Sequence, residues 1–403
     1  MDFLRSPRRP ALVLAVMVAV FCTATPPSAA PQPARRMVAV GDIHGAYESL
    51  TALLKSAGLI DAEERWSGGS ALLVQTGDML DRGARVRSVL DLLMRLEGEA
   101  RRAGGRVQIA LGNHEVMNLL HDFRDVSPEA FAAFADGRSE DRRDRAYKEV
   151  VALSKQRTPS AEPPDRAAWM TAHPPGFIEY TEAIGPRGRY GRWLRDRKVA
   201  IEEDGTLFMH AGIGPDTPGS IDDVNREVAR EIAAHDNRRA MLVQAEVIRP
   251  FFTLDETLAA AIAELQQIAK AIEAKQPLGE HVTREYVDAL QGLVQLNKSP
   301  LITEEGPLWF RGYARWPDEE EPKVVSLLER LGVVRVVCGH TPIVPGGITV
   351  RFGGRVILID TGMLTSTYKG GQASALEIKG TELTAIYTDR REMLTKPGGL
   401  QIR

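Results

Sequence analysis

The heptapeptide GDMLDRG, residues 77–83, decides the fold and most of the chemistry that this sequence predicts. It follows the apolar run Ala71–Val74, and an apolar run that ends at a glycine is typical of a buried strand that enters a tight loop. Rigid scaffolds present their functional side chains on such loops. Asp78 could bridge two cations there, Asp81 could orient a histidine and Arg82 could hold phosphate oxygens. Taken alone, the heptapeptide is explained equally well as a solvated turn with a surface ion pair.

Four other apolar runs end in the same way, each with a polar side chain and a glycine directly behind it. Together with the heptapeptide, the loops after these runs contain six candidate metal ligands: Asp42, His44, Asp78, Asn113, His210 and His340. Any one of these histidines alone would more often be structural. Together the six offer oxygen and imidazole donors without a thiolate, which suits Mn, Fe or Zn. Their wide separation along the chain means that only the fold can assemble the site.

Three consecutive strand–loop–helix units in the first third of the chain predict an α/β core with layered helices. Two charged, helix-rich stretches, at about 120–200 and 222–297, interrupt this pattern and are predicted to be insertions. We expect one catalytic domain over residues 37–388, followed by a tail at 389–403. The net charge of −3 gives no electrostatic reason to expect a nucleic-acid partner.

The first thirty residues have the pattern of a secretory signal peptide. A basic start precedes the apolar run Ala11–Val20, and small residues at 28–30 offer a cleavage site. The run is too short for a stable membrane span, although an uncleaved anchor remains the alternative. Cleavage would remove Cys22 and leave Cys338 as the only cysteine, which excludes an intrachain disulfide. The exact cleavage site and the choice between Sec and Tat export stay open.

The ordered motifs resemble those of the calcineurin-like metallophosphoesterases. Arg82 and Glu115 resemble the phosphoprotein phosphatase branch of that family. Further segments are similar to the Shewanella-like phosphatases, and these segments are 113–118, 122–126 and 306–313. The resemblance extends over residues 37–388 and implies a four-layer αββα fold, in which helices flank a central β-sandwich.

The resemblance also implies a role for each matched residue. Asp42, His44 and Asp78 would hold a first metal ion. Asp78 would bridge to a second ion that is held also by Asn113, His210 and His340. A metal-bridging hydroxide would attack phosphorus in line with the leaving group.

His114 would protonate the leaving oxygen, with Asp81 orienting its ring. Arg82, Arg311 and Asn113 would bind the phosphate, and Glu115 would fix the loop around it. For Arg311, an arginine that caps aromatic packing is the alternative interpretation.

The predicted function is therefore that of an exported, two-metal phosphomonoesterase of the protein-phosphatase type. Its substrate would be a phosphorylated protein or peptide, and the resemblance leaves open whether it prefers phosphotyrosine or phosphoserine and phosphothreonine. The alternatives are a hydrolase of small phosphate esters or dinucleoside polyphosphates, and a metal-bound scaffold without activity. The signal peptide favours a bacterial periplasm. The sequence does not define the metal, the physiological substrate or the oligomeric state.

Overall fold

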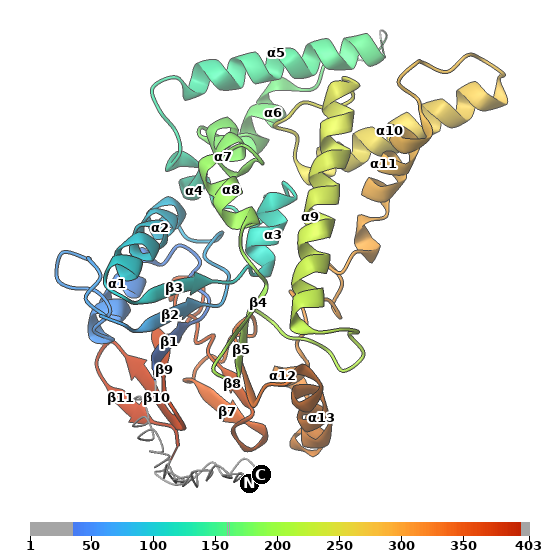
Figure 1. Ribbon diagram of the computed structural model, residues 1–403. Helices are drawn as coiled ribbons and strands as arrows, with labels where there is room; N and C mark the ends of the chain where they lie inside the picture. The colour runs from blue at the N-terminus through green and yellow to red at the C-terminus, as the bar shows by residue number, and fades with distance from the viewer. Residues whose placement is uncertain (1–34, 159, 161, 396–403) are drawn as a thin grey trace, which may run out of the picture. The chain divides into compact units, whose positions relative to one another are not determined.

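The computed structural model describes residues 35–158, 160 and 162–395, which form an α/β fold built on two mixed β-sheets (Figure 1). The predicted signal peptide and most of the predicted tail lie outside the described residues. Among the described helices, none has the length and the apolar character that a membrane crossing requires.

The first sheet combines a parallel core with an antiparallel edge. β1 pairs in parallel with β2, and β2 with β3, whereas β9, β10 and β11 add antiparallel strands on the other side of β1. In spatial order the strands are β11 (Arg391–Met393), β10 (Glu382–Tyr387), β9 (Ser374–Lys379), β1 (Arg36–Val40), β2 (Leu72–Gln75) and β3 (Arg106–Ile109). β11 extends this sheet past residue 388, where we expected the domain to end, because its backbone pairs with β10.

The second sheet has three parallel strands between two antiparallel edge strands. In spatial order these are β4 (Ala200–Glu203), β5 (Thr206–Met209), β6 (Arg335–Cys338), β8 (Val356–Leu358) and β7 (Thr349–Arg351). The edge strands β4 and β7 carry no strong apolar run, and the sequence did not predict them.

Alternate residues of the strands face the space between the two sheets. Met37 and Ala39 of β1 belong to the same apolar cluster as Phe208 of β5 and Val337 of β6. The residues between them, such as Val38, point to the opposite face and join the core under the helices. This two-residue alternation is what a strand buried on both faces requires.

Helices cover the outer faces of both sheets. α1 (Tyr47–Ser56) and α2 (Val86–Arg102) lie on the first sheet, and α12 (Gly312–Arg315) and α13 (Glu321–Leu331) lie beside the second (Figure 1). The layers follow the order helix, sheet, sheet, helix. The predicted αββα fold is therefore confirmed.

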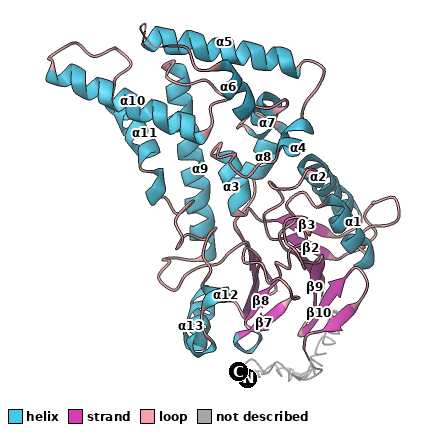
Figure 2. Ribbon diagram, turned by 180° about the vertical axis from the view of Figure 1, so that it is seen from behind, coloured by secondary structure: helices cyan, strands magenta, loops and turns pink. Residues whose placement is uncertain are grey.

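The two predicted insertions are helical and lie beyond one end of the strands, as both views show (Figure 2). Ser220 and Thr253 are the N-caps of the long helices α9 (Ile221–Gln244) and α10 (Leu254–Glu273). The hydroxyl oxygen of each cap accepts the backbone N–H of the residue three positions on, and the carboxylate of that residue accepts the backbone N–H of the cap. The helices that lie in these stretches are α4 (Pro128–Ala132), α5 (Ser139–Arg157), α6 (Arg166–Ala172), α7 (Phe177–Ile184), α8 (Arg189–Arg195), α9 (Ile221–Gln244), α10 (Leu254–Glu273) and α11 (Arg284–Val294).

His235 of α9 makes the stability of this helical region sensitive to acid. Its ring is fully buried, and neither nitrogen has a hydrogen-bond partner among the described residues. Burial, together with the charges of Arg239 and Arg238, lowers the pKa of His235 to about 3. Below about pH 6.5 this histidine becomes protonated in the unfolded chain but stays neutral in the folded chain. The stabilisation present above pH 6.5 is therefore lost as the pH falls towards 3.

We predict that a His235→Leu variant loses less stability in acid than the wild type. The difference in slope should approach about 1.4 kcal/mol per pH unit, the value for one proton. Urea unfolding between pH 7 and pH 4.5 measures it. A variant at the half-exposed His281, His281→Gln, is the control. Parallel curves for the wild type and His235→Leu would contradict the prediction.

Candidate active site

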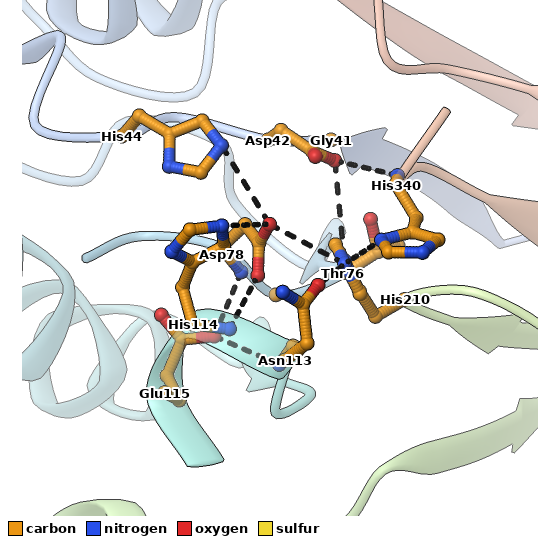
Figure 3. Close-up of polar contacts among 12 residues, drawn as sticks. Gly41, Asp42, His44, Thr76, Asp78, Asn113, His114, Glu115, His210 and His340 are labelled. Atoms are coloured by element: carbon orange, nitrogen blue, oxygen red, sulfur yellow. Dashed lines mark hydrogen bonds and ion pairs between the residues drawn. The ribbon is translucent and has the colours of Figure 1, made fainter. Parts of the chain in front are cut away.

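The predicted site residues lie together at the carboxyl ends of the parallel strands. Loops after β1, β2, β3, β5 and β6 carry them, and parallel strands present these ends at one edge of a sheet. All six candidate ligands are buried: Asp42, His44, Asp78, Asn113, His210 and His340 (Figure 3). Five loops far apart in the sequence thus converge on one polar centre.

The loop after β2 is held by the carboxylate of Glu115 at the start of α3 (Asn113–Leu119). Glu115 accepts backbone N–H groups from Asp78 at 2.7 Å, Met79 at 2.8 Å, Leu80 at 3.1 Å and Gly112 at 2.8 Å. In return, Asp78 Oδ1 accepts the backbone N–H of His114 at 3.1 Å. Glu115 therefore fixes the loop, as the sequence led us to expect.

The close approach of the two loops requires glycine at residue 112. A Cβ atom added to Gly112 would lie 2.2 Å from Asp78 Oδ1 and 2.5 Å from the Asp78 backbone nitrogen. No side chain fits in that space. Glycine at 112 thus allows Asp78 and His114 to sit on adjoining loops.

One group of donor atoms surrounds His210. Its Nε2 atom lies 2.8 Å from Asn113 Oδ1, 3.0 Å from His340 Nδ1 and 3.3 Å from Asp78 Oδ2. The other ring nitrogen of His340 lies 3.2 Å from the Trp309 carbonyl oxygen, which leaves Nδ1 free to act as an electron-pair donor. These four residues are the four that the sequence predicted for the second metal ion.

A second group lies on the other side of Asp78. His44 Nε2 is 3.6 Å and His114 Nε2 is 3.8 Å from Asp78 Oδ2 (Figure 3). His44 donates from Nδ1 to the Leu80 carbonyl at 2.9 Å, so its Nε2 keeps a lone pair. Asp42 contacts the first group instead, because its Oδ1 lies 4.0 Å from His210 Nδ1 and accepts the backbone N–H of His340 at 3.1 Å.

These groups fit divalent metal ions. Atoms that share one ion at metal–ligand distances of 2.0–2.2 Å lie about 3 Å apart, close to the separations around His210. Burial raises the pKa values of Asp42, Asp78 and Asp360. The charges of Asp360 and Asp78 raise the pKa of Asp42 further, and the charge of Glu115 raises that of Asp78. Crowded, buried acceptors of this kind need a cation among them to ionise together. Cys338 is buried with a raised pKa and takes no part in either group.

His114 and Asp81 form a buried acid–base pair beside these groups. His114 Nδ1 lies 2.6 Å from Asp81 Oδ2. Burial lowers the pKa of His114, but the charges of Asp78 and Asp81 outweigh it and raise the pKa to about 9. A raised pKa suits a group that takes up a proton and passes it on.

Arg82 and Arg311 both border the site. The Arg82 guanidinium lies 2.6 Å from His44 Nε2 and 2.9 Å from His114 Nε2, and it also contacts the Tyr368 hydroxyl. Arg311 is half-buried and donates to the His340 carbonyl at 2.9 Å. It stacks on no aromatic ring in the described part of the chain, so its contacts favour a place at the site over the capping alternative.

Comparison with known proteins identifies the family. The family model of the calcineurin-like phosphoesterases matches residues 35–243, about half of the chain. The chain belongs to the calcineurin-like phosphoesterase family. This phosphoesterase is thus a hydrolase of phosphoesters, as predicted, and its family uses divalent metal ions.

Individual relatives agree with this assignment. The phosphoesterase is 28% identical over 341 residues to an uncharacterized protein of Schizosaccharomyces pombe, covering 83% of this chain and 75% of that protein. It is 48% identical over 99 residues to Shewanella-like protein phosphatase 2 of Arabidopsis thaliana, about a quarter of each chain. Its fold is similar to a cold-active protein tyrosine phosphatase of a psychrophilic Shewanella, with a TM-score of 0.56, 24% identity, and 90% of this chain and 81% of that chain covered.

Sequence reasoning missed three buried residues of the site. Asp360 lies two residues past the end of β8 (Val356–Leu358) and precedes Thr361 and Gly362, so it has the same strand-end pattern as the predicted ligands. Asn118 and Tyr180 have no such signal. Asn118 donates to Asp81 at 2.8 Å and accepts from the Tyr180 hydroxyl at 2.6 Å. This chain of hydrogen bonds holds Asp81 Oδ1, while Asp81 Oδ2 contacts His114.

We predict that removing the Tyr180 hydroxyl weakens proton donation by His114. In a Tyr180→Phe variant, kcat for phenyl phosphate should fall between about 3- and 30-fold, less than the 10²–10⁴-fold effect of a whole general acid. For p-nitrophenyl phosphate the fall should be smaller, because nitrophenolate leaves without a proton. Tyr190→Phe, which removes a hydroxyl that bonds Asp91, is the control. Equal losses on both esters would indicate a general structural effect instead.

Proposed function

We propose that this phosphoesterase is an exported, two-metal phosphomonoesterase of the protein-phosphatase type. The observation that carries the proposal is the position of Asp78 Oδ2. It lies within 3.3 Å of His210 and 3.6 Å of His44, between two groups of donor atoms, and within 3.8 Å of His114. One carboxylate oxygen thus touches both proposed metal sites and borders the proposed acid.

Asp78, Asn113, His210 and His340 would hold one ion. His44 and Asp78 would hold the other, together with Asp42, whose carboxylate lies closer to His210 than the prediction implied. The oxygen and imidazole donors favour Mn, Fe or Zn. Two such ions would lower the pKa of a bound water and would neutralise part of the phosphate charge.

The chain's own residues would do the remaining work. His114 would give its Nε2 proton to the leaving oxygen, and Asp81 would hold the imidazolium in place through Nδ1. Arg82 would turn its donors from the two histidine rings to the phosphate oxygens, and Arg311 and Asn113 would bind these oxygens as well. A planar guanidinium binds two such oxygens at once, so it orients the ester as well as balancing its charge.

The likeness to the Arabidopsis phosphatase supports a phosphorylated protein or peptide as the substrate, although it extends over only a quarter of each chain. The first thirty residues support export, most consistently to a bacterial periplasm. N-terminal sequencing of the protein from its native host tests export. A chain that starts near residue 31 would support it, and one that retains Met1 would contradict it.

We predict that the Mn-loaded enzyme, residues 31–403, releases phosphate from phosphopeptides. The assay offers phosphotyrosine, phosphoserine and phosphothreonine peptides beside diadenosine tetraphosphate at equal concentrations. Peptide turnover should dominate, and the fastest peptide defines the side-chain preference. Dominant cleavage of the dinucleotide would contradict the protein-phosphatase assignment while keeping the metal site.

An Asp78→Asn variant separates catalysis from a scaffold function. In this variant kcat should fall about 10³-fold, because the metal ions would no longer stabilise the transition state by several kcal/mol. Asp144→Asn removes a carboxylate that pairs with Arg166 on the surface and should leave kcat unchanged. Retained turnover in clean Asp78→Asn protein would exclude the two-metal mechanism.

A further inference from the structure

An exposed carboxylate lies beside His114, the proposed acid. Asp125 Oδ2 is 3.8 Å from His114 Nδ1, and the Asp125 side chain is 41% exposed. The proposed donor atom, Nε2, belongs to the same ring, so its distance from Asp125 exceeds 3.8 Å by one ring width at most. A leaving group that takes its proton from Nε2 must therefore lie near this carboxylate.

The loop that follows α3 fixes the position of Asp125. Phe123, two residues earlier, is buried and packs edge to face against the rings of Phe177 and Tyr180. The Asp125 carbonyl accepts the backbone N–H of Arg82 at 2.9 Å. Asp125 is therefore held next to both the proposed acid and a proposed phosphate ligand.

The charge of Asp125 is not neutralised by a described lysine or arginine. Among the described residues, its carboxylate forms an ion pair within 4 Å only with His114. Arg124, the adjacent cation, lies 3.2 Å from Asp122 instead. His114 shares its Nδ1 proton with Asp81 at 2.6 Å, so it balances the charge of Asp125 only in part. Asp125 thus presents a negative charge to solvent at the edge of the site.

A negative charge at this edge affects how different substrates bind. It disfavours the phosphate group itself, because that group is also an anion. It favours a substrate whose remaining part brings a positive charge to the same edge. The ammonium or guanidinium group of a residue next to the phosphorylated one can reach there, since neighbouring Cα atoms are about 3.8 Å apart.

We propose that Asp125 selects phosphomonoesters whose leaving group carries a positive charge, such as peptides with lysine or arginine beside the phosphorylated residue. The Asp125 carboxylate would form an ion pair with that side chain. It would repel an anionic leaving group, including the nucleotide that a dinucleoside polyphosphate releases. The inference rests on the proposed function, because it takes His114 as the group that meets the leaving oxygen.

The test compares three aryl phosphates whose leaving phenols have similar size and differ in the charge of the para chain. Tyramine phosphate carries an ammonium group, the phosphate of 3-(4-hydroxyphenyl)propionate carries a carboxylate, and 4-propylphenyl phosphate has a neutral chain. The Mn-loaded wild type should have a higher kcat/KM for the cationic ester than for the anionic ester. Salt at about 1 M should reduce this ratio, because it shortens the screening length to about 3 Å.

Variants of Asp125 should change the ratio of kcat/KM for the cationic ester to kcat/KM for the anionic ester. Asp125→Asn should lower the ratio about fivefold or more, because the attraction of one ester and the repulsion of the other are both lost. Asp125→Lys, which reverses the charge, should lower it further. Asp144→Lys makes the same change of charge at a surface ion pair with Arg166 and should leave the ratio unchanged.

The neutral ester separates failure of this inference from failure of the proposed function. If the wild type hydrolyses none of the three esters, both are overturned. If it hydrolyses all three and Asp125→Asn leaves the ratio unchanged, the phosphatase function stands and the role of Asp125 is overturned. A wild-type ratio of one or less would exclude the proposed substrate class. An equal change in Asp144→Lys would reduce the effect to net charge and overturn the inference.

Discussion

The carboxylate of Glu115 is the interaction on which the rest of the active site depends. It is fully buried and accepts four backbone N–H groups, three from the loop after β2 and one from the loop after β3. Such donors stabilise a buried negative charge that would otherwise be very costly. They also fix Asp78 in a left-handed backbone conformation with φ of 59°. The position of Asp78 and the start of α3 are therefore set by a residue that need not touch the substrate.

Hydrogen bonds from the surroundings also decide the histidine tautomers. His44 uses Nδ1 on the Leu80 carbonyl and His340 uses Nε2 on the Trp309 carbonyl, so each directs its other nitrogen at Asp78 or His210. His114 uses Nδ1 on Asp81, which directs Nε2 outward. Backbone carbonyls and one carboxylate thus decide which nitrogens face the centre. The site is organised for cations by its surroundings, as outer contacts organise metal sites in general.

Local patterns in the sequence predicted the α/β core and the candidate ligands, and the family resemblance added the order of the layers. An apolar run, a polar residue and a glycine mark a strand end wherever they occur, and Asp360 has this pattern although we overlooked it. Asn118 and Tyr180 could not be found in this way, since their role arises from a contact between α3 and α7. The edge strands β4, β7 and β11 were missed because their short segments are stabilised by pairing more than by apolar character.

The central claim is that Asp78 joins two metal ions in one site. The most direct measurement is the metal content of the Mn-loaded protein by plasma mass spectrometry, combined with low-temperature electron paramagnetic resonance. The account predicts two manganese ions per chain and the spectrum of an exchange-coupled pair. Replacement of Asp78 by asparagine should abolish the coupling. One ion per chain, or two ions that give only the spectrum of isolated manganese, would contradict the account.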